Sequence, residues 1–355
     1  MRSIQSLDTT IHFNNSCYQA LSTHLELNNY SKIFILVDQN TNKACLDEFT
    51  QHLAHKYAFQ HFEIPAGEHA KTIETCQWVW NELSRCDADR KSLLINLGGG
   101  VVTDLGAFVA STFKRGISFI NVPTSLLAMV DASVGGKTGV DLGNLKNQIG
   151  TISLPQMVLI DTSFLKSLPE AHFRSGLAEM LKHGLITEKA YWHDVISSVS
   201  SNFTTIDALI YQSVHIKNDV VTTDPYEDGL RKTLNYGHTL GHAIESYFLK
   251  HPKKQELLHG EAIAIGMVLE TYLSQKLTNF PPQEAVEVKA AFYNIFGKIE
   301  FNNDDINAII ELLKFDKKNS YGNINFVLLE NYGKAKLDQK VSNELILEAF
   351  EFYNS

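Results

Sequence analysis

Residues 92–113 read SLLINLGGGVVTDLGAFVASTF, and this stretch sets the expected fold. The apolar run 92–97 is a strand candidate, glycines 98–100 form a turn, and residues 105–113 have a helical pattern. Such a strand, turn and helix start can direct backbone N–H groups at a phosphate. The turn departs from the GxGxxG fingerprint, because Thr103 stands where a third glycine belongs and no acidic residue follows about 20 positions on. By itself it therefore predicts either an anion-binding turn or a tight turn with close strand and helix packing.

Similar apolar, β-branched runs recur on both sides of this stretch across the first 160 residues. They read KIFILVD at 32–38, ISFINV at 117–122 and MVLID at 157–161, with helix-length amphipathic segments between them. Continuous apolar runs are typical of parallel strands that are buried on both faces. Asp38 ends the first run, so we expect its carboxylate at the carboxyl edge of the sheet, where it could bind a ribose.

The strand signal nearly disappears after Pro169, and helical patterns replace it. They cover residues 170–182, 237–249 and 261–273, and one late strand candidate lies at 323–329. We therefore predict an α/β domain with a Rossmann-like parallel sheet over residues 1–170, and a mainly α-helical domain over residues 171–355.

Composition limits the classes of ligand. The chain has 355 residues, 44% of them hydrophobic, and a formal net charge of −9. Bulk electrostatics therefore disfavour binding to nucleic acid or anionic membranes, so an anionic ligand needs a local cationic pocket. No signal-like start and no apolar run of roughly 20 residues is present, which predicts a cytoplasmic protein. The cysteines lack CxxC spacing and are expected to be reduced and structural: they are Cys17, Cys45, Cys76 and Cys86.

A second glycine-rich segment, residues 122–150, reads VPTSLLAMVDASVGGKTGVDLGNLKNQIG. Its GGKT at 135–138 is similar to a P-loop, but Asp131 stands where that motif needs glycine and would repel phosphate. The sequence therefore excludes an NTPase and predicts a polar loop. Its lysines could reach a phosphate beside the glycines, and a solvated loop is the alternative. The polar side chains concerned are Asp131, Lys137, Asp141, Lys146 and Asn147.

Histidines and carboxylates suggest a metal site. In residues 231–245 (RKTLNYGHTLGHAIE), a helix beginning near Tyr236 places His238, His242 and Glu245 on one face. This is not a zincin motif, because no glutamate lies between the histidines at the required position.

Two further segments supply candidate ligands. His259 begins another apolar helix, and Glu179 lies one turn from Lys182 on an earlier one. One carboxylate and two imidazoles with open positions form a common catalytic zinc arrangement. Lone histidines are more often structural, but their co-occurrence with Arg231, Asn235 and Glu179 favours a catalytic metal site.

Together these segments resemble the 3-dehydroquinate synthase family of the sugar-phosphate cyclase superfamily over most of residues 33–330. The resemblance implies an active site in the cleft between the two domains, NAD and one divalent metal ion (Zn²⁺ or Co²⁺) as cofactors, and a homodimer. It implies Glu179, His238 and His259 as metal ligands, which leaves His242 as an acid/base group.

The resemblance also implies the other site residues. NAD contacts are implied at Asp38, Glu68, Lys71, Gly99, Gly100, Val101, Val102, Thr103, Asp104, Thr124, Ser125, Lys137, Lys146, Phe164, Leu165, Lys166 and Ser167. Substrate contacts are implied at Arg115, Asp131, Lys137, Lys146, Asn147, Lys182, Lys217, Arg231, Asn235, His242, His259 and Lys317. Catalytic roles are implied for His242, Lys137, Asp131 and Asn235. Thr103 and Ser125 depart from the glycine and threonine often seen in the family.

The implied reaction converts 3-deoxy-D-arabino-heptulosonate 7-phosphate to 3-dehydroquinate and phosphate, the second step of the shikimate pathway. Lys137, Asn147 and Lys182 would hold the phosphate, with Arg115 reaching over from a second subunit. Arg231 and Lys217 would suit the carboxylate.

Three alternatives remain open. Another sugar-phosphate cyclase is disfavoured by the carboxylate-binding pair Arg231 and Lys217. A metal-dependent polyol dehydrogenase, which would release NADH, is disfavoured by the phosphate-binding lysines. A catalytically inactive ligand-binding or scaffold protein is disfavoured because competent residues occupy the positions expected to do chemistry.

Overall fold

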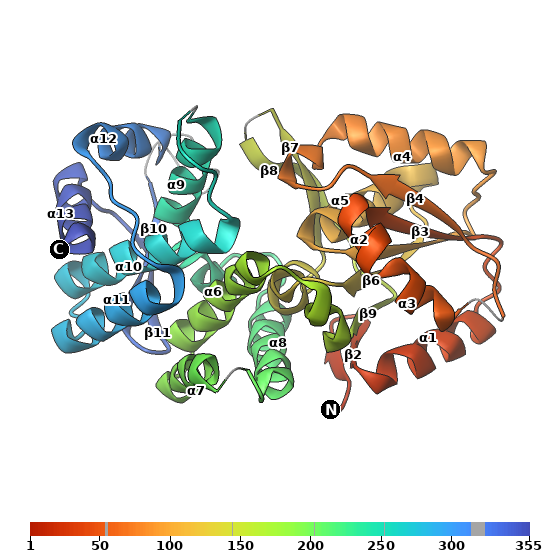
Figure 1. Ribbon diagram of the computed structural model, residues 1–355, viewed down its shortest axis with the longest axis horizontal. Coiled ribbons are helices and arrows are strands. Elements are labelled where there is room, and N and C mark those ends of the chain that lie inside the picture. The colour runs from red at the N-terminus through yellow and green to blue at the C-terminus, as the bar shows by residue number, and fades with distance from the viewer. Residues whose placement is uncertain (54–55, 144, 202, 252, 314–323) are drawn as a thin grey trace. The chain divides into compact units, whose positions relative to one another are not determined.

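A computed structural model describes residues 1–53, 56–143, 145–201, 203–251, 253–313 and 324–355. The chain divides into two compact units, Met1–Pro169 and Glu170–Ser355 (Figure 1). The first unit is α/β and the second is mainly helical, so the predicted fold class is confirmed.

A seven-stranded sheet forms the centre of the first unit, in the order β1-β2-β9-β6-β5-β3-β4. The strands are β1 (Ile4–Ser6), β2 (Thr9–Phe13), β3 (Ile33–Asp38), β4 (Gln60–Ile64), β5 (Leu93–Gly98), β6 (Ser118–Pro123) and β9 (Met157–Ile160). β1 and β2 pair antiparallel, and the other neighbours pair parallel. β3, β5, β6 and β9 are the four predicted strands. The prediction missed β1, β2 and β4, which are short and carry alternating polar residues.

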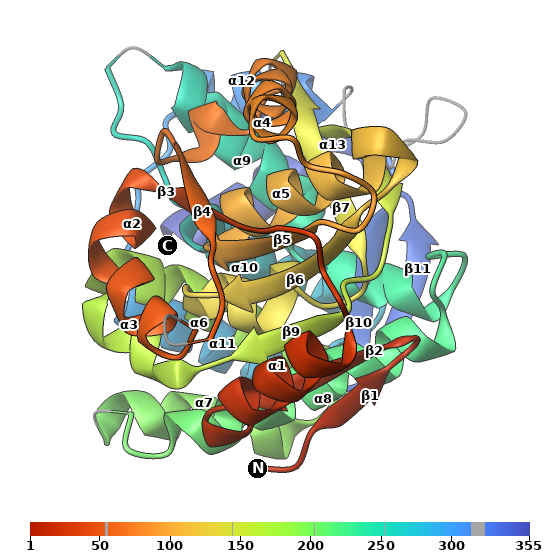
Figure 2. The same cartoon turned by 90° about the vertical axis from the view of Figure 1, so that its right-hand side faces the viewer.

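Helices cover both faces of this sheet. They are α1 (Asn15–Leu27), α2 (Gln39–Ala44), α3 (Leu46–Gln51), α4 (Ile73–Arg85) and α5 (Gly100–Thr112), with short turns η1 (Glu68–Ala70), η2 (Phe113–Arg115), η3 (Ala128–Ala132) and η4 (Thr162–Ser167). α4 and α5 lie on one face and α1 on the other (Figure 2). The connection that contains α1 runs across the sheet in one direction, and the connections that contain α4 and α5 run in the other. Right-handed crossovers therefore place α1 on the opposite face from α4 and α5. α5 begins at Gly100, five residues earlier than predicted, so it includes Thr103 and Asp104.

The expected polar loop in residues 122–150 is wrong for its second half. That part forms an antiparallel hairpin of β7 (Lys137–Leu142) and β8 (Leu145–Ile152), which packs against α5. A Cβ atom added at Gly150 would lie 2.0 Å from the carbonyl oxygen of Thr138. The glycines that suggested a loop therefore allow two strands to approach closely.

The second unit is built around one buried helix. Its elements are α6 (Glu170–Ile186), α7 (Lys189–Ser200), α8 (Ile206–Thr223), η5 (Leu230–Asn235), α9 (His238–Lys250), α10 (His259–Leu277), α11 (Pro282–Phe296), α12 (Asn303–Leu312), α13 (Asn343–Asn354), β10 (Phe326–Asn331) and β11 (Lys334–Gln339). α10 is apolar on most of its surface and packs against α6, α9, α11, α13 and β10. A helix that is hydrophobic all round is expected in such a central position.

The helix boundaries differ slightly from those predicted. α6 and α10 extend beyond the predicted ranges, and α9 begins at His238 because Gly237 adopts a left-handed conformation with φ 78°. The late strand candidate corresponds to β10, although residue 323 lies outside the described ranges; β11 was not predicted, and its half-exposed pattern gives little apolar signal. Within the described ranges, no helix has both the length and the apolar character needed to cross a membrane.

Candidate active site

The predicted NAD-binding residues gather at one edge of the sheet. Most of them follow the carboxyl ends of five neighbouring parallel strands: Phe164, Leu165, Lys166 and Ser167 after β9, Thr124 and Ser125 after β6, Gly99, Gly100, Val101, Val102, Thr103 and Asp104 after β5, Asp38 at the end of β3, and Glu68 and Lys71 after β4. Open α/β sheets bind ligands at this edge, where the strand order reverses. Here the reversal lies between β3 and β5.

The glycine turn brings the ends of β5 and β6 together. The Thr124 amide donates to the Gly98 carbonyl at 3.0 Å, and a Cβ atom at Gly99 would lie 3.3 Å from Ser125 Oγ. Gly99 is the N-cap of α5 and has no side chain to cap the first-turn amides, so an anion suits this position. The local geometry therefore fits a phosphate of a dinucleotide.

Gly106, three residues after Thr103, has the packing role expected of a third glycine at position 103. A Cβ atom at Gly106 would lie 2.0 Å from Asn96 Oδ1 on β5. The third glycine of a dinucleotide-binding turn allows close helix and strand packing. Thr103 is buried instead, and its hydroxyl donates back to the Gly100 carbonyl at 3.2 Å.

Asp38 has a local structural role as well. Its Oδ1 accepts from the amides of Asn40 at 2.9 Å and Thr41 at 2.8 Å, which caps α2. This cap fixes the carboxylate at the end of β3, as expected for a residue that could contact a ribose.

Lys71 is the centre of a buried polar network. Its ammonium donates to Asp104 Oδ2 at 2.7 Å and to Asn147 Oδ1 at 2.6 Å. Burial lowers the pKa of Lys71, but the charges of Asp104 and Glu68 outweigh burial and raise it. The lysine is therefore a permanent cation that joins α5 to the β7–β8 hairpin.

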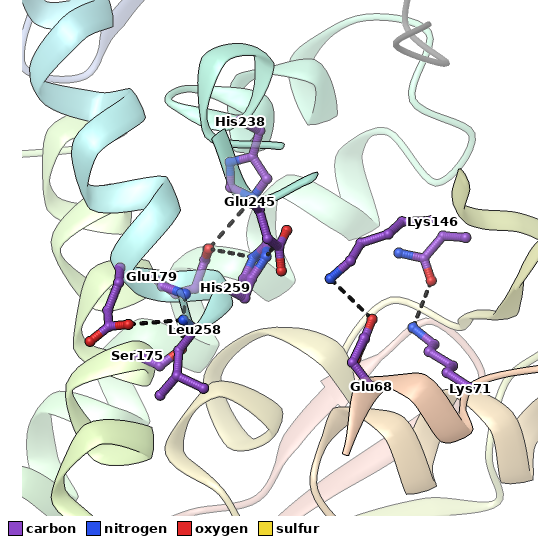
Figure 3. Close-up of polar contacts among 12 residues, drawn as sticks. Glu68, Lys71, Lys146, Ser175, Glu179, His238, Glu245, Leu258 and His259 are labelled. Atoms are coloured by element: carbon purple, nitrogen blue, oxygen red, sulfur yellow. Dashed lines mark hydrogen bonds and ion pairs between the residues drawn. The ribbon is translucent and has the colours of Figure 1, made fainter. Parts of the chain in front are cut away.

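The hairpin supplies two predicted ligands to the same network. Lys146 Nζ lies 3.3 Å from Glu68 Oε1 (Figure 3), and the Asn147 amide donates to Asp141 Oδ1 at 2.7 Å. Asn147 has a left-handed φ of 51°, so this hydrogen bond holds it in an unusual conformation. The sequence indicates Asp141 only as a polar loop residue, whereas in the structure its carboxylate orients Asn147.

Three candidate metal ligands converge in the second unit. Glu179 Oε1 lies 3.5 Å from His238 Nε2 and 3.6 Å from His259 Nε2 (Figure 3). These residues come from α6, α9 and the first position of α10, and the Glu179 side chain is fully buried. One carboxylate oxygen and two imidazole nitrogens that face one another are a donor set suited to Zn²⁺ or Co²⁺.

His242 lies beside this group. His238, His242 and His259 each offer a ring nitrogen, and these nitrogens lie within 4.8 Å of one another. The geometry thus brings the predicted acid/base residue next to the predicted ligands, and it also permits His242 to act as a ligand.

Neighbouring groups orient both ligand rings. His238 Nδ1 lies 3.1 Å from the Tyr236 carbonyl oxygen, and His259 Nδ1 lies 3.3 Å from Glu245 Oε2. Each Nδ1 can donate a proton to that oxygen, and Nε2 is then the ring nitrogen whose lone pair suits a metal ion. Glu245 was predicted on the histidine stripe of α9, but its contact with His259 on the next helix could not be read from spacing.

The charge around His259 favours a cation. Burial lowers the pKa of His259, but the charge of Glu245 and the contacts with Glu179 and Glu245 outweigh burial and raise it to about 9. A site that holds a proton this strongly will also attract a metal ion, which competes with that proton for the ring nitrogen.

Three cationic side chains that were predicted to bind substrate are buried in the second unit. Lys182, Lys217 and Arg231 are 1%, 6% and 3% exposed. Lys182 forms an ion pair with Glu179, and Arg231 Nη1 donates to the Pro225 carbonyl at 2.6 Å. These three cations supply the local positive charge that binding of an anionic ligand would need.

The 224–235 segment is held by two acidic residues. Asp224 accepts backbone hydrogen bonds from Gly229 at 2.8 Å and Arg231 at 2.9 Å, which lowers the pKa of Asp224. Asn235 Nδ2 donates to Glu227 Oε1 at 2.6 Å. These contacts fix the backbone of Arg231 and the amide of Asn235.

Three further predicted site residues lie on other elements of the first unit. Asp131 lies in η3, Lys137 is an exposed residue at the start of β7, and Arg115 ends η2 just before β6. Arg115 thus lies at the amino edge of the parallel sheet, opposite the edge with the predicted NAD contacts. Lys317 lies outside the described residues.

Comparisons with known proteins show the family of the chain. The chain matches the families described as 3-dehydroquinate synthase N-terminal over residues 61–175 and 3-dehydroquinate synthase C-terminal over residues 176–319. It is 43% identical to a 3-dehydroquinate synthase of Parabacteroides distasonis over 91% of this chain and 92% of the relative.

Solved structures share the fold at lower identity. A 2-epi-5-epi-valiolone synthase from Streptomyces hygroscopicus, with NAD⁺ and Zn²⁺ bound, has a TM-score of 0.86 at 24% identity over 99% of this chain and 98% of that one. A 2-deoxy-scyllo-inosose synthase complexed with carbaglucose-6-phosphate, NAD⁺ and Co²⁺ has a TM-score of 0.84 at 21% identity over 99% of both chains. The sequence matches, together with the converging ligands, show that the chain belongs to the 3-dehydroquinate synthase family.

Proposed function

We propose that this chain is a lyase that converts 3-deoxy-D-arabino-heptulosonate 7-phosphate to 3-dehydroquinate and phosphate. The reaction proceeds by transient oxidation at C5, β-elimination of phosphate, re-reduction, ring opening and intramolecular aldol closure. The convergence of Glu179 Oε1 on His238 Nε2 at 3.5 Å and His259 Nε2 at 3.6 Å carries this proposal. Membership of the 3-dehydroquinate synthase family supports it further.

The residues divide into cofactor-binding and metal-binding groups. Glu179, His238 and His259 would hold the divalent ion, and the loops at the carboxyl edge of the sheet would hold NAD. When bound, NAD supplies a reversible hydride acceptor and the metal ion polarises substrate hydroxyl oxygens.

The cationic residues would bind the two anionic ends of the substrate. Arg231, whose guanidinium can donate two parallel hydrogen bonds, and Lys217 suit the carboxylate. Lys182, Lys137 and Asn147 suit the phosphate. With both ends held, the reacting carbons are kept in one orientation.

His242 is proposed to transfer the proton at the C5 oxygen, because an imidazole titrates near neutral pH. Asp131, Asn235 and Lys146 complete the proposed polar contacts with substrate. Oxidation at C5 makes the C6 hydrogen acidic, so the departing phosphate can remove that proton as it leaves.

The position of Arg115 bears on the oligomeric state of the protein. Its position at the amino edge of the sheet supports a contribution to the active site of a second subunit, and we propose a cytoplasmic homodimer. Light scattering of the purified protein would test the assembly.

One assay separates the main function from its rivals. Purified protein is incubated with the heptulosonate phosphate, catalytic NAD and Zn²⁺, and phosphate and dehydroquinate are measured together. Equal yields of both products, well above the amount of NAD, are expected because NAD is regenerated. Steady accumulation of NADH would instead indicate a polyol dehydrogenase, and no product at all an inactive binding protein.

Metal affinity should depend on pH. Since the pKa of His259 is raised to about 9, the ring is protonated at neutral pH and must lose this proton to bind a metal ion. The apparent affinity for Zn²⁺ is therefore expected to rise about tenfold per pH unit from pH 7 to 9 and to level off above. Competition with a chelator of known affinity measures it. A flat profile across this range would contradict the assigned role of His259.

Replacing Glu245 should weaken the metal site without removing a ligand. Glu245→Gln removes the negative charge that faces His259 Nδ1, and such outer partners are worth roughly 10–100-fold in metal affinity. The same chelator competition measures the loss. Glu344→Gln, an exposed change in the first turn of α13, is the matched control and should bind Zn²⁺ like the wild type.

A further inference from the structure

Two helices that carry metal ligands touch through their backbones. His238 begins α9 and His259 begins α10. A Cβ atom at Gly266 of α10 would lie 2.0 Å from the Gly237 carbonyl oxygen, and one at Gly241 of α9 would lie 2.7 Å from an atom of Ile263. Small residues at these positions let the helices approach closely, so the position of one helix constrains that of the other.

A buried carboxylate of α10 caps the start of α9. Glu270 is 0% exposed; its Oε2 accepts from the Gly237 amide at 2.7 Å and its Oε1 from the Leu240 amide at 3.2 Å. Helix starts usually use the side chain of the N-cap residue for this purpose, but the N-cap of α9 is Gly237. The glutamate of the neighbouring helix takes that role, and its negative charge also suits the positive end of the α9 dipole.

The capped turn is the part of α9 that contains His238. His238 is the first residue of the helix, and its Nδ1 contact is the carbonyl of Tyr236, which lies two residues earlier, just before the helix begins. Tyr236 is itself tied to α10, because its hydroxyl lies 2.6 Å from Thr271 Oγ1. An uncapped first turn frays before the rest of a helix, so His238 depends on this cap more than His242, which lies one turn further on.

We infer that Glu270 is a positioning residue for the metal centre, which fixes the first turn of α9 so that His238 meets His259 and Glu179. This inference rests on the metal centre of the proposed function. Glu270 does not touch the metal ion or the substrate in this role. It determines where one ligand stands relative to the other two.

Co²⁺ provides a direct probe, because its visible spectrum reports the ligands and geometry of the site. Glu270→Ala removes both hydrogen bonds, and Glu270→Gln keeps one acceptor oxygen but loses the charge. Co²⁺ binding is expected to weaken about a hundredfold in Glu270→Ala and about tenfold in Glu270→Gln, with a changed spectrum in both.

The control removes a helix cap elsewhere in the same unit. Asn302 Oδ1 accepts from the Asp305 amide at 2.9 Å and caps α12, so Asn302→Ala has the same kind of structural effect. It should bind Co²⁺ with the affinity and spectrum of the wild type. If Glu270→Ala does not fold, Glu270→Gln carries the test alone.

The outcomes separate the inference from the function on which it rests. Wild-type protein that binds no Co²⁺ overturns the metal centre itself. Wild-type protein that binds Co²⁺ while folded Glu270→Gln shows the same affinity and spectrum overturns the positioning role. A weaker and spectrally changed site in Glu270→Gln, with an unchanged Asn302→Ala, supports it.

Discussion

The His259→Ala variant is expected to lose both turnover and its metal ion while it keeps its fold. His259 contributes one of the two imidazole nitrogens that face Glu179 Oε1, at 3.6 Å. With only one carboxylate and one imidazole left from the proposed set, the site should lose most of its affinity for Zn²⁺. A fall in kcat on the order of a thousandfold or more is expected, since the polarising ion is absent. Metal content after dialysis, phosphate release and circular dichroism measure the three quantities.

Two further histidine variants serve as comparisons for His259→Ala. His242→Ala should retain the metal ion but lose turnover, because His242 is the proposed proton-transfer group. His193→Ala changes an exposed histidine of α7 and should behave like the wild type. Full activity in His259→Ala would refute the metal assignment, and loss of metal from His242→Ala would make that residue a ligand.

The sheet was largely predictable because its central strands are buried on both faces. β3 and β5 are continuous apolar runs, and the glycines after β5 mark the turn into α5. The β7–β8 hairpin was not predictable in the same way. Its glycines suggest a loop when read along the chain, and their function appears only when the partner strand lies 2.0 Å from the missing Cβ position of Gly150.

The candidate site shows the same difference between local and long-range information. Helical spacing places His238, His242 and Glu245 on one face, but it cannot bring Glu179 or His259 to them. The sequence offers those two as candidate ligands, but only the family resemblance assigns them to one site with His238, and helix packing supplies the contacts that place them together.

The sequence gives one weak indication that Glu270 has a special role, because it is a carboxylate within the otherwise apolar helical residues 262–273. Lone acidic residues in such helices are buried only when they have partners. The partners here are amides of another helix, which no pattern along the chain identifies. Acidic residues in buried helices therefore merit attention as caps of neighbouring ligand helices.

The second large effect is expected in the first unit, at the buried pair of Lys71 and Asp104. Their side chains are 5% and 20% exposed, and Lys71 Nζ lies 2.7 Å from Asp104 Oδ2. Lys71→Met leaves this carboxylate largely buried without its cation. Because breaking a buried pair leaves an uncompensated charge, we expect a loss of about 3 kcal/mol in unfolding free energy. Urea unfolding, followed by tryptophan fluorescence, measures it.

The double variant Lys71→Met/Asp104→Asn separates charge from packing. If the stability lost in Lys71→Met comes from the unpaired carboxylate of Asp104, neutralising that carboxylate should recover most of it. Lys56→Met is the matched control, since Lys56 pairs with Glu26 at 2.9 Å at an exposed site, and its unfolding midpoint should barely move.

The variants should rank differently in their affinity for NAD than in their stability. We propose both Lys71 and Asp104 as cofactor contacts, so the double variant should regain stability but still bind NAD weakly, as judged by isothermal titration. A double variant that regains both would mean that the pair only holds α5 and the β7–β8 hairpin together. A double variant no more stable than Lys71→Met would mean that the lysine contributes through packing and its hydrogen bond to Asn147 rather than through the charge of Asp104.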